Sequence, residues 1–220
     1  MFEIMKAALS EKSELQDGDM ALINALSLAE LKPEDVFVFR VAACNDEVDR
    51  DMERFPLETL QQLAEMYVGR TVICDHRWSA GNQTARIYKA EVDEVDGLHR
   101  LVVSCYMLTN VSSLDTITAI KGGILKEVSI GCRISWARCS ICGNDAYDYA
   151  KCPHVKGREY EGKTCFYDLM DPLDAYELSF VAVPAQPKAG VIKSQNNGSW
   201  SPADLEKAKA QLRIEHERWK

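Results

Sequence analysis

Apolar residues occur mostly in short runs along this chain, and the spacing within each run predicts the element that it forms. Runs rich in β-branched and aromatic residues, which are typical of strands, occupy residues 36–41, 71–74, 85–95, 98–107, 125–136 and 177–183. Asp96-Gly97 separates two of these runs, and this dipeptide accepts the positive φ angles of a tight turn. The pattern therefore predicts a chain dominated by strands, with a hairpin over residues 85–107.

Helical spacing of apolar residues occurs in a few other segments. It predicts an N-terminal helix that Lys32-Pro33 ends, and helices over residues 55–69 and 112–123, each of which ends at glycine. Ser201-Pro202 begins a terminal helix rich in Ala, Leu, Lys and Glu. Because strands and helices do not alternate regularly, the expected fold class is α+β, built around a sheet or barrel.

The same patterns divide the chain into three parts. Residues 1–33 form an N-terminal adjunct with its helix, and residues 34–192 form the main domain with an insertion over residues 137–167. Residues 193–220 comprise a polar linker and the C-terminal helix. We find no internal repeat.

Composition narrows the class of protein. The chain has 220 residues, 46% of them apolar, which is enough for a sizeable core, and its formal net charge of −8 argues against a nucleic-acid-binding surface. The longest uncharged stretch, residues 101–114, is too short and polar for a membrane span. The N-terminus lacks a basic leader before an apolar core, so secretion by a cleavable signal is not expected. The protein is therefore expected to stay in a reducing cytosol. There, the eight cysteines need an explanation other than disulfides.

Three cysteines and a histidine lie close together in the insertion. They form two pairs that can close a tetrahedral zinc site: Cys139 with Cys142, and Cys152 with His154. Gly143 permits the tight turn that points both thiolates of the first pair the same way. Four protein ligands leave no open position for water, so the expected zinc ion is structural and metalloprotease chemistry is not expected. Cys165 is an alternative to His154, and reduced cysteines without metal are the other interpretation.

Two residues outside the insertion could carry chemistry. His76 follows an apolar strand and enters a loop of small and polar residues, a place where strands commonly present catalytic groups. Ser129 lies on an apolar strand, and Gly131 would let another backbone approach closely. Taken alone, each also fits an ordinary structural role.

Several segments share their order and spacing with one known family. They are the 36–41 strand with its acidic loop, the helix ending at Gly69, Val72-Ile73-Cys74-Asp75-His76, the Asp96-Gly97 hairpin, Glu127-Val128-Ser129-Ile130-Gly131 and Tyr176-Glu177-Leu178-Ser179-Phe180-Val181-Ala182-Val183-Pro184-Ala185-Gln186-Pro187. Over residues 36–192 this combination resembles the prohead (capsid maturation) serine proteases of tailed phages. That family is distantly similar to the herpesvirus assemblins. The resemblance implies a herpesvirus-protease-like β-barrel with surrounding helices, to which this chain adds the small zinc-binding insertion.

The resemblance also implies an activity, a serine endopeptidase with Ser129 as nucleophile and His76 as general base. We assign Glu177 as the third member, because a carboxylate can orient the imidazole, and Asp75 is the alternative. The implied substrates are the scaffolding protein, the major capsid protein and the chain's own termini, inside the immature capsid in the host cytoplasm. Self-association is left open. Besides the insertion, residues 83–87 depart from the family pattern, where relatives often carry a glycine.

Other interpretations compete with this one. Cys74 near His76 suggests a cysteine protease, but the two residues are too close in sequence for an in-line dyad. Lys126 precedes Ser129 by three residues, so on a strand the two side chains point to opposite faces. A catalytically silent scaffold or capsid component with a structural zinc site is the main non-enzymatic alternative. A zinc-ribbon nucleic-acid adaptor is the other, and the net charge of −8 disfavours it.

Overall fold

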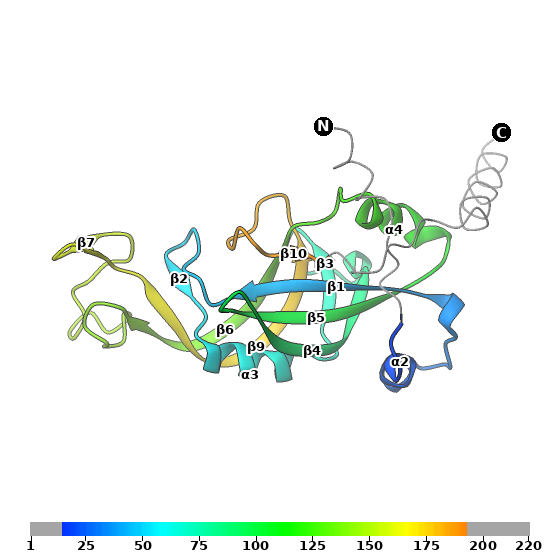
Figure 1. The fold of residues 1–220 in the computed structure, drawn as a ribbon, viewed down its shortest axis with the longest axis horizontal. Coiled ribbons are helices and arrows are strands. Elements are labelled where there is room, and N and C mark those ends of the chain that lie inside the picture. Colours follow the sequence, from blue (N-terminus) through cyan, green and yellow to red (C-terminus); the bar gives the residue numbers. More distant parts are fainter. Residues whose placement is uncertain (1–14, 193–220) are drawn as a thin grey trace.

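The computed structural model describes residues 15–192, which form a mixed α+β fold around one large sheet (Figure 1). The helices are α2 (Asp19–Leu26), α3 (Leu57–Tyr67) and α4 (Leu114–Lys121), with short 3₁₀ turns at Pro33–Asp35, Ala80–Asn82 and Val111–Ser113. The strands are β1 (Val36–Asn45), β2 (Glu53–Arg54), β3 (Thr71–Cys74), β4 (Ala85–Val95), β5 (Leu98–Leu108), β6 (Val128–Cys139), β7 (Glu159–Tyr160), β8 (Lys163–Thr164), β9 (Tyr167–Phe180) and β10 (Gly190–Val191).

The large sheet has eight strands in the order β10-β1-β5-β4-β3-β9-β2, and β6 pairs with β9 as well. β9 is antiparallel to β6 but parallel to β3 and β2. β7 and β8 form a separate hairpin. The long strand β9 therefore joins three other strands, and the candidate catalytic residues lie on or beside it.

The sheet does not close into a barrel, so the expected barrel is not formed. Within residues 15–192, β1 and β6 are not paired, and a single bridge from Glu127 to Gly190 links the segment before β6 to β10. A Cβ at Gly190 would lie 3.0 Å from the carbonyl oxygen of Lys126, so glycine permits this close approach. Because β10 has only two residues, pairing stops there and a gap remains between β1 and β6.

The main core lies between the sheet and α3. Leu60, Leu63 and Tyr67 of this helix are fully buried, and they recur at the helical spacing that the sequence predicts. Gly69, with a φ of 82°, follows the helix. The phenol of Tyr67 donates a hydrogen bond to the carbonyl oxygen of Gly131, 3.0 Å away. This contact ties α3 to the part of β6 that carries Ser129.

Most elements lie where the sequence predicts them, and the exceptions are informative. The hairpin is confirmed, with φ angles of 55° at Asp96 and 78° at Gly97. The predicted 125–136 strand begins at Val128 and continues to Cys139, and the predicted 177–183 strand spans Tyr167–Phe180. β6 and β9 extend because they pair along almost their full lengths, through two register shifts. Such mutual support between strands is invisible in either segment alone.

The N-terminal helix packs directly on the sheet. Ile23 of α2 is fully buried in a small apolar cluster with Tyr88 and Tyr106, and the Tyr88 phenol donates to the Asp19 carboxylate at 2.9 Å. The helix ends at Leu26, before the predicted end at Lys32-Pro33. The predicted linker and terminal helix over residues 193–220 lie outside the described residues.

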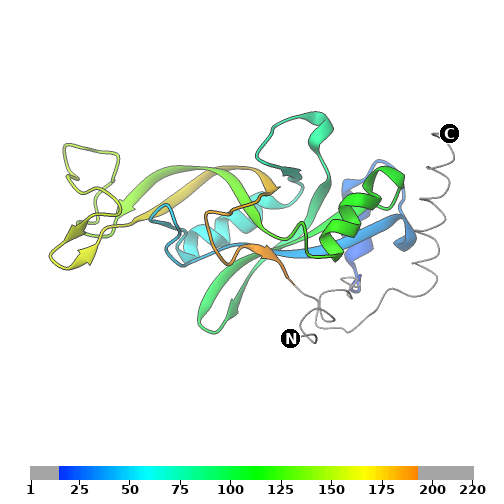
Figure 2. The ribbon, with the colours of Figure 1, turned by 90° about the horizontal axis from the view of Figure 1, so that it is seen from above.

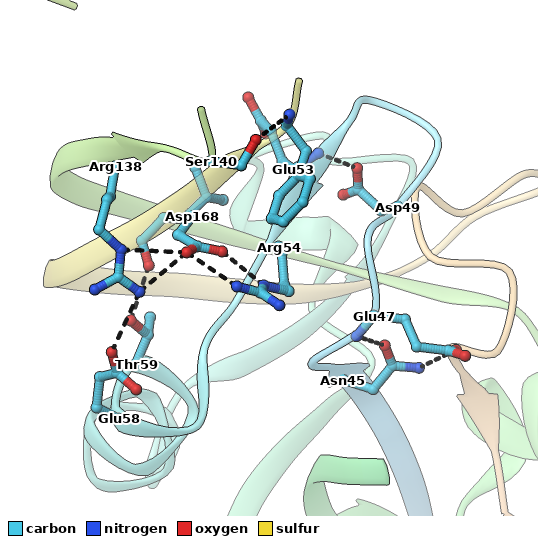
Figure 3. Close-up of polar contacts among 12 residues, drawn as sticks. Asn45, Glu47, Asp49, Glu53, Arg54, Glu58, Thr59, Arg138, Ser140 and Asp168 are labelled. Carbon is cyan, nitrogen blue, oxygen red and sulfur yellow. Dashed lines mark hydrogen bonds and ion pairs between the residues drawn. The ribbon is translucent and has the colours of Figure 1, made fainter. Parts of the chain in front are cut away.

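A buried carboxylate joins β9 to β2 and β6 (Figure 3). Asp168 is 4% exposed and accepts hydrogen bonds from both Arg54, at 2.6 and 3.0 Å, and Arg138, at 3.3 and 3.0 Å. Two guanidinium groups compensate the cost of burying one carboxylate. The insertion begins beyond these ion pairs, where the chain leaves the sheet. Its strand β7 lies at the opposite end of the molecule from α4 (Figure 1 and Figure 2).

Candidate functional site

The C-terminal end of β9 and the facing part of β6 place four residues on one face of the sheet. Ser179 of β9 lies opposite Ser129 of β6, and Glu177 lies opposite Gly131. Residues directly opposite each other in an antiparallel pair share a face, as do residues two apart along a strand. Ser129 and Glu177 therefore face the same side of the sheet.

His76 reaches this face from the other neighbour of β9. It follows β3, and both Asp75 and His76 have left-handed backbone angles, with φ of 56° and 50°. The turn is held to β9 by two hydrogen bonds, from the Asp75 N–H to the Phe180 carbonyl oxygen at 3.0 Å and from the His76 N–H to Ser179 Oγ at 3.1 Å. These bonds offset the strain of two consecutive left-handed residues.

The imidazole of His76 contacts the carboxylate of Glu177. His76 Nδ1 lies 2.8 Å from Glu177 Oε1, and the Glu177 side chain is 3% exposed whereas that of His76 is 43% exposed. A carboxylate accepts hydrogen bonds, so Nδ1 donates and a neutral ring keeps a lone pair on Nε2. This arrangement can orient the ring and stabilise its protonated form.

Gly131 makes room for that carboxylate. A Cβ at this position would lie only 2.3 Å from Glu177 Oε1, a separation that real Cβ atoms do not show. The sequence predicts that Gly131 admits another backbone, but the structure shows that it admits the Glu177 side chain. Any larger residue would displace the carboxylate or the strand.

Ser129 is half-buried on β6. Strand β9 lies between β6 and β3, and the turn that carries His76 follows β3. In the part of the chain that the structure describes, its hydroxyl makes no hydrogen bond to His76 or to any other side chain. The structure thus brings His76 and Glu177 into contact and places Ser129 on the same face without a direct bond.

The two alternatives drawn from residues next to His76 gain no support from the geometry. Asp75 is exposed, and within residues 15–192 its carboxylate makes no hydrogen bond to the His76 ring. Burial raises the pKa of the Cys74 thiol, with a further contribution from Asp75. A raised pKa disfavours the thiolate, which is the nucleophilic form of cysteine.

Ser179 is a member of this network that sequence reasoning did not single out. It is fully buried, its hydroxyl donates to Glu177 Oε2 at 2.5 Å, and the same oxygen accepts from the His76 N–H. Ser179 therefore links the carboxylate to the turn that carries the imidazole. The available signal was a polar residue two positions after Glu177 on an apolar strand.

A second cluster lies in the insertion and can hold a metal ion. One ligand atom from each of four residues lies within 4.8 Å of all the others, namely those of Cys139, Cys142, Cys152 and His154. A tetrahedral ion with metal–sulfur bonds of about 2.3 Å needs ligand atoms roughly 3.8 Å apart, so small side-chain shifts would close the site. The structure brings together all four residues that the sequence predicts.

Local backbone geometry favours the thiolates of the first pair. The Gly143 N–H donates to the Cys139 carbonyl oxygen at 2.8 Å, and Gly143 has a φ of 74°. Burial opposes ionisation of Cys139, but the N–H groups of Cys142 and Ile141 outweigh it and lower the pKa of this thiol. The Asn144 N–H lowers the pKa of the Cys142 thiol. Metal ions bind the thiolate form, so these donors suit a metal site.

Cys165 lies beside this quartet. Its Sγ is 3.8 Å from the Sγ of Cys139, and its side chain is fully buried. Burial raises the pKa of Cys165 to about 11, with hydrogen bonding to Cys139 adding to the shift. Burial raises the pKa of Cys152 to about 11 as well, so this shift does not separate the two thiols. Cys165 is the weaker candidate for the fourth ligand because it is not one of the four residues whose ligand atoms all lie within 4.8 Å of one another.

No helix among residues 15–192 combines the length and the apolar character needed to cross a bilayer.

A comparison with protein-family models found no match for this chain, and a search of curated proteins found no significant match either.

Proposed function

We propose that this protein is a serine endopeptidase in which Ser129 is the nucleophile, His76 the general base and Glu177 the group that orients the base. The observation that carries the proposal is the hydrogen bond between His76 Nδ1 and Glu177 Oε1, formed on the sheet face that also presents Ser129. A histidine that is oriented by a buried carboxylate and lies on the same face as a serine is one arrangement that activates serine for acyl transfer.

In the proposed mechanism, Ser129 Oγ attacks the carbonyl carbon of a peptide bond while His76 Nε2 accepts the hydroxyl proton. The Glu177 carboxylate stabilises the imidazolium that forms, and His76 then donates the proton to the leaving amine. Water hydrolyses the resulting acyl-enzyme by the same proton transfers in reverse order. Ser129 and His76 must come closer than in the structure without substrate, as catalytic hydrogen bonds often do when substrate binds.

The resemblance supplies the biological setting of this proposal. The enzyme belongs to the prohead maturation type and cleaves the scaffolding protein, the major capsid protein extension and itself inside an immature phage capsid in the host cytoplasm. The sequence segments that carry the resemblance include those that hold His76, Ser129 and Glu177.

The metal of the insertion is, in this proposal, a structural zinc ion. Three thiolates and one imidazole are a common ligand set for zinc, and four protein ligands leave no position for a reacting water. Zinc would hold the insertion together and take no part in peptide hydrolysis.

One observation favours a second candidate function. Ser129 makes no side-chain hydrogen bond among the described residues, as expected of a catalytically silent scaffold or capsid component with a structural zinc site. Labelling with a fluorophosphonate, which reacts with activated serines, separates the two. Modification of Ser129 supports the protease, and an unreactive Ser129 in assembled proheads supports the silent component.

Mass spectrometry of co-expressed scaffolding and capsid proteins tests the proposed function. Ser129→Ala should stop processing, because loss of a triad serine typically lowers the rate by about 10⁶-fold. His76→Ala should also stop it, whereas Glu177→Gln should slow it less. Processing by Ser129→Ala at the wild-type rate would show that the assignment is wrong.

Matched controls lie within the same chain. Ser135→Ala removes an exposed hydroxyl from the same strand β6. His99→Ala removes the histidine of a second His–carboxylate pair, His99 Nδ1 with Asp46 Oδ2 at 2.6 Å, which lies elsewhere on the sheet. Both variants should process the substrates at the wild-type rate.

A further inference from the structure

A cavity of about 290 Å³ lies beside the candidate nucleophile, in the gap where the sheet fails to close. Ser129 and its neighbours on β6 line one side, and Ala43 and Cys44 of β1 line another. On the far side of Ser129 is β9, which carries Glu177 and holds the His76 turn. Ser129 therefore lies between the proposed base and this cavity.

Much of the cavity wall is apolar. The residues that make it so are Ala43, Cys44, Phe55, Cys132, Leu169 and Ala189. Burial raises the pKa of the Cys44 thiol, and burial raises that of Cys132 to about 11. Both thiols are therefore neutral near pH 7 and behave as small apolar groups. This wall suits a chain of methylene groups.

Three acidic residues also line the cavity: Asp49 and Asp51 from the loop between β1 and β2, and Glu53, the first residue of β2. Figure 3 shows Asp49 on the loop and Glu53 at the start of β2, where Asp49 Oδ1 accepts from the Glu53 N–H at 2.9 Å. Glu53 forms an ion pair with Lys156 at 2.5 Å. The other two carboxylates have no such partner among residues 15–192.

Within residues 15–192, Lys156 pairs with Glu53 and also attracts Asp51, so positive charge cancels these carboxylates only in part. No lysine or arginine is among the residues that line the cavity. Arg54 is engaged by the buried Asp168, and Arg50 donates to the carbonyl oxygen of Pro184. The cavity thus combines an apolar wall with a negative charge that a ligand can neutralise.

We propose that this cavity is the specificity pocket of the enzyme and receives a lysine or arginine side chain on the acyl side of the cleaved bond. The inference rests on the proposed function, because it takes Ser129 as the nucleophile. Long basic side chains bury a methylene stem along apolar surface and keep a charged end for polar partners. Here the stem would contact Phe55 and Leu169, and the charged end would approach Asp49 and Asp51.

Two measurements on the purified full chain test this inference. The first compares kcat/KM for four peptides that differ only in the residue on the acyl side of the cleaved bond. That residue is Lys, Arg, Leu or Glu. Lys and Arg peptides should be cleaved about 10- to 100-fold more efficiently than the Leu peptide, the range expected for hydrogen bonds to a charged group. The second follows backbone NMR shifts of Ser129→Ala on addition of agmatine, the decarboxylated form of arginine, or of 1-pentanol as a neutral control.

Asp51→Lys tests most directly whether the negative charge of the cavity selects basic side chains. Asp51 is exposed, and its carboxylate makes no hydrogen bond or ion pair within residues 15–192, so the change should leave the fold intact. It should abolish the preference for Lys and Arg and weaken agmatine binding at least tenfold. Glu65→Lys is the matched control, because it reverses an exposed charge on α3 outside the cavity and should keep both properties.

The outcomes separate this inference from the proposed function. Cleavage that depends on Ser129 but shows no preference for Lys or Arg, or a preference that Asp51→Lys leaves unchanged, overturns the specificity pocket and leaves the protease intact. Agmatine shifts around Phe55 without cleavage of any peptide or co-expressed substrate overturn the protease, while the cavity stands as a cation-binding site.

Discussion

The candidate site on the sheet and the cysteine cluster in the insertion assemble their side chains in different ways. His76 and Glu177 are 101 residues apart in sequence and meet because β3 pairs in parallel with β9. The four metal-ligating candidates lie within one insertion, where short turns bring them together. The sheet site should therefore respond to changes in strand packing, and the insertion should respond to the metal. Four predictions test that separation.

Loss of the metal should have the largest effect on stability, and it should be confined to the insertion. Cys142→Ser removes one of the four candidate ligands and should therefore lower the zinc content. The effect on the insertion should be large, because structural zinc sites of this kind contribute about 10–16 kcal/mol of apparent binding free energy that is linked to folding. Cys142 is exposed, so the change creates no cavity in the core. Elemental analysis measures the zinc, and hydrogen exchange should show loss of protection from Cys139 to Cys165 first.

Cys74→Ser is the control for that prediction, because Cys74 lies on β3 outside the insertion and should leave the zinc content unchanged. Absence of stoichiometric zinc from the wild-type protein would contradict the zinc site. Loss of protection at β9 as early as in the insertion would contradict the proposed separation of the two regions.

Gly131→Ala should have the next largest effect and should act on the sheet site alone. The added Cβ would meet Glu177 Oε1 at 2.3 Å, so the carboxylate must move away from His76. We expect a loss of about 1–3 kcal/mol in the free energy of unfolding and a rate reduction of about 10²-fold. Denaturant unfolding and peptide hydrolysis measure the two.

Gly81→Ala provides the comparison for that variant. A Cβ there meets nothing within 4 Å, and Gly81 lies in the loop that follows His76. Its rate should match that of the wild type. An unchanged rate for Gly131→Ala would show that the position of the Glu177 carboxylate does not matter for the reaction.

Ser179→Ala should reduce stability about as much as Gly131→Ala but should lower the rate less, because the contact between His76 and Glu177 does not involve Ser179. It removes the donor to Glu177 Oε2 and the acceptor for the His76 N–H, and a buried group left without a partner costs about 1–3 kcal/mol. Thermal unfolding measures that loss. The NMR signal of the His76 Nδ1 proton should shift or broaden, whereas that of His99 should not change.

The smallest effect is expected for Cys165→Ser. If His154 is the fourth ligand, this variant keeps one zinc ion per chain, whereas His154→Ala loses it. The comparison is direct because each residue lies beside a cysteine of the cluster, Cys165 beside Cys139 and His154 beside Cys152. Zinc loss from Cys165→Ser with retention in His154→Ala would transfer the fourth ligand to Cys165.

Local signals predicted much of the fold. The Asp96-Gly97 turn, the end of α3 before Gly69 and the short strand β3 all follow from residues within a few positions of one another. Strand lengths were harder, because β9 begins at Tyr167 and passes through Asp171 and Pro172, which disfavour strands. Its pairing with β6 overrides those local preferences.

By itself, the sequence predicted which residues cluster in the insertion, since Cys139, Cys142, Cys152 and His154 are close along the chain and Gly143 allows the required turn. Through the family resemblance, it also predicted His76, Ser129 and Glu177 as the catalytic residues. Only the tertiary structure decided that Glu177 contacts the imidazole, that Gly131 makes space for the carboxylate and that Ser179 holds both. Those contacts depend on the register of three strands and on a sheet that stays open, and register is a property of paired strands, which no single segment contains.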